Sequence, residues 1–199
     1  MPNYRLMLFV DGENFTARGQ ALLGDDLNFE GSETYYMKDV FLWIPIPHTA
    51  RHLHMIDANL GNWNLDPAVR SHYYTSLKGS HEDVARVEDR LRELHFEPYV
   101  FKRENQRHSK GVDISMTVSA LHHAHHDNYD VACLVAGDAD FIPLVEEIKW
   151  LGKRAMVMFY EDNVAPRLRR AADDFYSITD RMRHAWIEAQ RTAQSKRGA

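Results

Sequence analysis

A chain of 199 residues can bury the core of one α/β domain, and its hydrophobic fraction of 44% is ordinary for a globular protein. With 24 Lys and Arg against 29 Asp and Glu, the formal charge of −5 excludes recruitment of nucleic acid by bulk charge, so an anionic partner needs a local basic patch. The single Cys133 excludes an internal disulfide. Because no apolar run reaches the ~20 residues of a membrane span and no signal-peptide pattern opens the chain, a cytoplasmic protein without membrane contact is expected.

The first predicted elements are a strand and a helix. Residues 4–10 form an apolar run that ends at Asp11, which is typical of a buried strand. A helix is expected to follow from Asn14 to about Leu23.

The segment 24–70 is the least regular part of the chain. We interpret it as an insertion with at most one helix, near 48–59. Its large apolar residues predict that it is ordered and either packs on the domain or covers a partner subunit, so a homo-oligomer stays open. These residues are Trp43, Ile44, Ile46 and Trp63.

Strands and helices alternate from residue 71 onward. Further strands are expected at 71–77, 97–102, 129–136, 154–160 and 175–178. Helices are expected at 81–96, 110–126, 140–151, 164–172 and from 180 into a polar tail at about 190–199. This alternation predicts a single α/β domain: a three-layer, doubly wound, mostly parallel sheet of strand order 3-2-1-4-5, with helices on both faces.

Two acidic residues follow strands that this order makes neighbours. Asp11 ends the first strand, and Asp138 ends the fourth. Ligands of doubly wound sheets bind beyond the carboxyl ends of the strands, so both carboxylates are expected in one crevice. Asp140 follows two residues later, in "LVAGDADFIPLV".

A further acid, Asp113, opens the helix predicted at 110–126. On a helical wheel it falls among the apolar residues Ile114, Ala120, Leu121 and Ala124. A carboxylate facing a core is costly unless it is paired, hydrogen-bonded or bound to a metal. Taken singly, Asp11, Asp113 and Asp140 each also fit the role of a helix N-cap. Taken together, four close carboxylates repel one another without a counter-ion, and hard cations such as Mg²⁺ or Mn²⁺ suit them.

Three motifs in chain order are similar to a known family. "FVDGENF", "KGVDISMTVSALHHA" and "YDVACLVAGDADFIPLVEEIKWLGKRAMVM" resemble the NYN (LabA-like) family of PIN-like nucleases, and "LRRAADDFYSI" resembles the segment that closes its domain. The resemblance covers residues 6–14 and about 73–178. It implies the PIN-like fold and hydrolysis of RNA with Mg²⁺ or Mn²⁺.

The resemblance also implies roles for individual residues. The metal ligands and catalytic acids would be Asp11, Asp113, Asp138 and Asp140. Asn14 would orient a water or the scissile phosphate. The chain departs from the family at Ala136, where relatives often have Ser, and at Ser119, where many have a further acid.

A basic segment precedes Asp113. In "FKRENQRHSKG", Arg107 and Lys110 are candidate contacts for the phosphates of an RNA, expected to be single-stranded, although a merely solvated loop fits as well. Aromatic residues of the strands, among them Tyr73 and Tyr74, fit either base stacking or the core. The histidines at 122–126 have metal-ligand spacing, but we interpret them as a solvated helix end rather than a zinc site.

The leading hypothesis is thus a metal-dependent ribonuclease. A non-catalytic RNA-binding or regulatory module of the same fold is the alternative. A phosphatase of the haloacid dehalogenase type needs a second Asp two residues after Asp11, where this chain has Glu13. A glycosyltransferase reading of Asp138 and Asp140 lacks an accompanying nucleotide-sugar signal.

Overall fold

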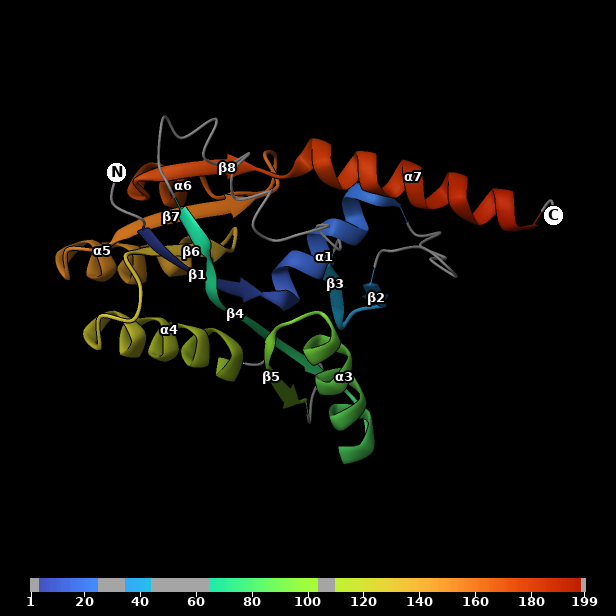
Figure 1. Ribbon diagram of the computed structural model, residues 1–199, viewed down its shortest axis with the longest axis horizontal. Helices are drawn as coiled ribbons and strands as arrows, with labels where there is room; N and C mark the ends of the chain where they lie inside the picture. The colour runs from blue at the N-terminus through green and yellow to red at the C-terminus, as the bar shows by residue number, and fades with distance from the viewer. Residues whose placement is uncertain (1–3, 25–34, 44–64, 104–109, 198–199) are drawn as a thin grey trace.

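A computed structural model describes residues 4–24, 35–43, 65–103 and 110–197 (Figure 1). Its elements in chain order are β1 (Tyr4–Asp11), α1 (Gly12–Leu23), β2 (Tyr35–Met37), β3 (Phe41–Trp43), β4 (Leu65–Leu77), α3 (His81–Glu93), β5 (Glu97–Lys102), α4 (Lys110–His125), β6 (Val131–Val135), the 3₁₀ turn η1 (Ala139–Phe141), α5 (Ile142–Trp150), β7 (Arg154–Phe159), α6 (Pro166–Ala171), β8 (Asp174–Ser177) and α7 (Thr179–Arg197).

The main sheet has six strands in the order β5-β4-β1-β6-β7-β8, and every neighbouring pair is parallel. This confirms the predicted α/β sheet and its order 3-2-1-4-5, with β8 added at the far edge. In the register, Asp11 lies opposite Tyr74, which in turn lies opposite Tyr99. All five residues of β6 are buried, as expected of a central parallel strand covered on both faces.

Helices cover both faces of the sheet (Figure 1). Right-handed crossovers put α1 and α3 on one face and α4, α5 and α6 on the other. α7 lies against α1. Within the described residues, no helix is both long and apolar enough to cross a membrane.

The helix with the clearest sequence pattern, α3, forms as expected. The Ser80 hydroxyl accepts from the Asp83 N–H at 3.1 Å, and the Asp83 carboxylate accepts from the Ser80 N–H at 2.8 Å. This reciprocal cap satisfies two backbone donors that a helix start leaves unpaired. Val87 and Leu91 are buried against the sheet, as their spacing predicts.

A two-stranded antiparallel hairpin, β2–β3, packs on α1. Leu42 is fully buried, and its backbone N–H and C=O both bond the Tyr73 phenol, at 3.2 and 3.0 Å. The Trp43 ring meets Phe96 edge-on, with ring centroids 4.9 Å apart. This part of the segment 24–70 is therefore ordered. The other residues named for it (Ile44, Ile46, Trp63) and the helix expected near 48–59 lie outside the described residues.

The second strand of the sheet is longer than predicted. β4 begins at Leu65 instead of residue 71. Its pairing with β1 shifts register between the pairs Arg5–Asp66 and Met7–Arg70. Pro67 lies at this irregularity, where a strand tolerates a residue that has no N–H to donate.

Candidate functional site

The turn from β1 into α1 holds Asp11 in a buried position. Asp11 is 3% exposed, and its Oδ1 accepts from the Asn14 N–H at 3.2 Å. The side chain is thus the N-cap of α1, the structural role that its position allowed. A Cβ added at Gly12 would lie 2.2 Å from the Tyr73 ring and 2.7 Å from the Tyr74 carbonyl oxygen. Only glycine lets the helix start this close to β4, which fixes where Asp11 lies.

The turn after β6 presents Asp138 to solvent beside this position. A Cβ at Gly137 would lie 2.3 Å from the Phe159 ring, so the turn also packs tightly on its neighbour. Asp138 is exposed, and its Oδ1 accepts from the Asp140 N–H at 3.2 Å. The Gly137 carbonyl accepts from the Ala165 N–H at 2.8 Å, which joins this turn to the start of α6. Because β1 and β6 are parallel neighbours, Asp11 and Asp138 both lie at the carboxyl end of the strands.

The third acid, Asp113, lies in the first turn of α4 and is exposed. The apolar face predicted for this helix is correct at Ala120 and Ala124, which are buried, and wrong at Ile114. The helix buries Val112, Met116, Ala120 and Ala124, a row spaced by four residues. Ile114 is 63% exposed because it lies outside that row. Asp113 is therefore not buried in the core. It is exposed in the first turn of α4.

The electrostatics of Asp11 tie these acids together. Burial is the main cause that raises the pKa of Asp11 to about 7; the Asn14 N–H opposes this rise, and the carboxylates of Asp113, Glu13 and Asp138 add to it. A carboxylate whose pKa is raised by its neighbours lies close enough to feel their charge. The structure thus places Asp113 and Asp138 within electrostatic reach of Asp11.

Glu13 is an acid of this cluster that the sequence reasoning missed. Its carboxylate accepts a hydrogen bond from the Ser76 hydroxyl, near the carboxyl end of β4. The available signal was its place in the motif Asp-Gly-Glu-Asn, between Asp11 and Asn14. The nearby Arg103 guanidinium donates to the backbone carbonyls of Ser76 and Asp39 and anchors the chain after β5.

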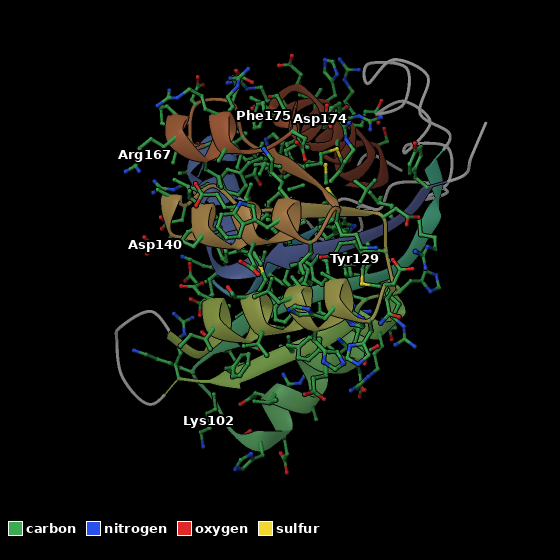
Figure 2. All side chains as sticks on the ribbon, turned by 90° about the vertical axis from the view of Figure 1, so that its left-hand side faces the viewer. Lys102, Tyr129, Asp140, Arg167, Asp174 and Phe175 are labelled. Carbon is green, nitrogen blue, oxygen red and sulfur yellow. The ribbon has the colours of Figure 1, made fainter. Side chains whose placement is uncertain are left out.

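The remaining predicted residues lie around this edge or outside the described chain. Asp140 is exposed in η1 and points outward, and Figure 2 shows it at the same side of the molecule as Lys102 and Arg167. Asn14 is half-buried in the first turn of α1. Lys110 is the first residue of α4, and Arg107 lies outside the described residues.

The donor chemistry of the cluster suits a hard divalent cation. Carboxylate oxygens are the ligands that Mg²⁺ and Mn²⁺ prefer, and a cation would offset both the burial and the repulsion that raise the pKa of Asp11. Among the residues that the structure describes, no three His, Cys, Asp or Glu side chains are already grouped so that they could hold a metal ion. Asp113 and Asp138 are exposed, so their side chains can turn toward a cation without repacking of the core.

The histidines near the end of α4 pack on one another. The rings of His122 and His126 lie 4.2 Å apart between centroids, and His126 Nδ1 is 2.8 Å from the His122 carbonyl oxygen. His123 bonds the Asn128 amide at 2.9 Å.

A family model for the NYN domain matches residues 5–179. The chain belongs to the NYN domain family. This confirms the resemblance of the motifs, and with it the PIN-like nuclease fold. NYN domains are generally nucleases, that is, hydrolases of phosphodiester bonds.

A solved structure has the same fold as this NYN domain. It is the crystal structure of a protein of unknown function from Vibrio parahaemolyticus RIMD 2210633, with a TM-score of 0.57 and 19% sequence identity over 88% of this chain and 93% of that chain. At this identity the likeness shows the fold alone. No curated protein matches the chain.

Proposed function

We propose that this NYN domain is a metal-dependent ribonuclease that hydrolyses phosphodiester bonds of single-stranded RNA at the edge formed by Asp11, Asp113 and Asp138. The observation that carries the proposal is the buried Asp11 carboxylate, with a pKa raised to about 7 amid other acids. A group whose pKa is strongly shifted is a candidate functional residue when it lies at the carboxyl ends of the strands of a doubly wound sheet. Membership of a nuclease family supports the same reading.

In this proposal Asp11, Asp113 and Asp138 hold Mg²⁺ or Mn²⁺, and the exposed Asp140 is a further ligand of the ion. The bound cation would supply an activated water and stabilise charge on the phosphoryl oxygens. The chain's own contribution is positioning. Asp11 is fixed by its bond to the Asn14 N–H, while Asp113 on α4 and Asp138 in the turn after β6 are exposed and would complete the ligand set. Asn14, one turn along α1 from Asp11, orients the water or the scissile phosphate.

The first test is cleavage by the purified chain. We expect labelled single-stranded RNA to be cut in Mg²⁺ or Mn²⁺, and cutting to stop in excess chelator and to return when the metal is restored. The measurement is product formation on a denaturing gel over a panel of RNA sequences. RNA binding without cleavage across the panel and both metals would instead favour the non-catalytic binding module.

The basic segment before α4 is expected to contact the RNA backbone. Replacing Arg107 and Lys110 with Ala should weaken binding and flatten its salt dependence. On a single strand, each lost phosphate contact lowers the magnitude of the slope of log binding constant against log salt concentration by roughly 0.7. The measurement is Kd over a salt series in chelator. As a matched control we propose Arg86→Ala with Arg90→Ala, two exposed bases of α3 that pair with acids of their own helix. Equal slopes in wild type and the first double variant would exclude this segment from the RNA path.

A further inference from the structure

A pocket of about 440 Å³ opens between α4 and the strands β4 and β5. β4 contributes Arg70 and His72, β5 contributes Glu97 and Tyr99, and α4 lines it from Ser115 to His123. These strand residues face α4, and Asp11 shares their face of the sheet because it lies in register with Tyr74 and Tyr99. The pocket therefore lies on the same face of the sheet as the acidic cluster.

The pocket is lined by a buried imidazole, that of His72, whose nitrogens lack hydrogen-bond partners among the described residues. His72 is 1% exposed, and its ring stacks on Phe9 with centroids 5.2 Å apart and planes at 6°. Among the described residues neither ring nitrogen has a hydrogen-bond partner. Burial lowers the pKa of His72 to about 4, so at neutral pH the ring offers one N–H donor and one acceptor. The half-exposed His123 ring lies 5.1 Å away, and its turning aside would give a ligand access to these nitrogens.

The walls combine an aromatic ring and hydroxyls with one Arg–Glu ion pair. The Tyr99 ring, which lines the pocket, stacks on Tyr74 with centroids 4.6 Å apart and planes at 15°. Ser115 and Ser119 add hydroxyls. The cation Arg70 is already paired with Glu97 at 3.1 Å. Flat faces with neutral donors and acceptors suit a nucleobase, whereas a phosphate would meet Glu97 without an unpaired cation to offset it.

The pocket lies within one or two nucleotides of the acids. Asp11, Tyr74 and Tyr99 are opposite one another on three adjacent strands, which spans about 10 Å at the usual strand spacing. Ser115 follows Asp113 by two residues on α4. An RNA strand with a phosphate at the acids therefore brings a neighbouring base over Tyr99.

We propose that this pocket binds one base of the RNA strand beside the scissile phosphate, with the base stacked against Tyr99 and its edge bonded to His72. The ligand class rests on the proposed ribonuclease function. The site itself rests on the pocket, on the unpartnered buried imidazole and on the register that joins both to Asp11.

The test is an abasic scan of binding in chelator, where cleavage does not interfere. A labelled single-stranded RNA carries one abasic nucleotide, moved along the strand of an otherwise fixed sequence. The register of the strand on the protein is set by a single cleavage position, mapped beforehand with metal. We expect one position next to that cleavage point to cost roughly tenfold in Kd when its base is removed, which is the scale of one base–aromatic stack. Tyr99→Phe keeps the ring and should retain this loss, whereas Tyr99→Leu should bind more weakly and show no loss at that position.

A second pair of variants does not disturb the sheet. Val118 lines the pocket and is 61% exposed, while Ile114, one turn earlier on α4, is 63% exposed, lies outside the lining and is nearer to Asp113. We expect Val118→Glu to weaken binding of the intact RNA several-fold more than Ile114→Glu. A larger effect of Ile114→Glu, or an abasic scan that is flat in wild type, overturns the pocket even if the protein cleaves RNA. If the protein cuts no RNA but Val118→Glu still weakens binding several-fold more than Ile114→Glu, the pocket stands and the nuclease does not.

Discussion

Replacing Asp138 with Asn is expected to lower RNA cleavage by roughly a thousandfold in Mg²⁺ or Mn²⁺. The substitution removes a charge and nearly preserves shape, and the amide oxygen that Asp138→Asn introduces can still accept from the Asp140 N–H, as the carboxylate does now. The cost falls on metal binding and on stabilisation of the transition state. RNA affinity in chelator should hold or rise slightly, because a negative charge near the phosphates has gone. The measurements are single-turnover cleavage rates with metal and Kd values without it.

The design includes a matched control and a double variant. Asp162→Asn removes another exposed carboxylate from the same edge, in the turn after β7, and should leave cleavage nearly unchanged. The double variant of Asp11→Asn with Asp138→Asn should cost little more than either single change, because both disable one site. Activity that survives both substitutions would place the catalysis elsewhere or in a contaminant.

The fold was largely accessible to sequence reasoning. Short apolar runs bounded by polar turns mark each inner strand, and the right-handed crossover rule leaves few orders for strands that alternate with helices. The start of β4 was not accessible, because Pro67 resembles a strand breaker. Only its pairing partner shows that it lies at a register shift between β4 and β1.

The candidate site was accessible in part. Asp11 and Asp138 follow strands, so the strand order alone predicts that they meet. Asp113 was placed near them for a wrong reason, since periodicity could not distinguish the row that packs, Val112 and its partners, from the exposed Ile114. Glu13 was missed because its approach to the cluster depends on the Ser76 hydroxyl of a strand distant in sequence. The pocket is likewise hidden in the sequence, since it needs the register of two strands and the position of α4.

The second large effect concerns stability and its dependence on pH. The folded pKa of Asp11 is about 7, while the ordinary value is 3.8. The folded protein therefore binds more protons than the unfolded chain between these values, and its stability falls as pH rises through that window. Relative to acid pH, the cost above pH 7 approaches about 4 kcal/mol in the free energy of unfolding. A divalent cation at the cluster should offset much of it.

Asp11→Asn should remove this cost without removing the helix cap, because Asn is as good an N-cap as Asp. At pH 8 in chelator we expect the variant to be about 2–4 kcal/mol more stable than wild type, and the difference to shrink as pH falls from about 7 toward 4. The buried neutral His72, with a pKa of about 4, gives both proteins the opposite slope, since protonation of the unfolded chain below pH 6.5 lowers stability. This contribution cancels in the difference between the two proteins.

The measurement is urea unfolding at pH 5 and pH 8, each in chelator and in saturating Mn²⁺. Mn²⁺ at pH 8 should raise the midpoint of wild type and leave that of Asp11→Asn nearly unchanged, because the ion binds the folded wild type alone. Asp162→Asn should follow wild type in all four conditions, since an exposed carboxylate is nearly as well solvated in the folded protein as in the unfolded chain. A variant that is as stable as wild type at both pH values would show that Asp11 acts only as a cap. In that case the raised pKa would carry no argument for a cation site.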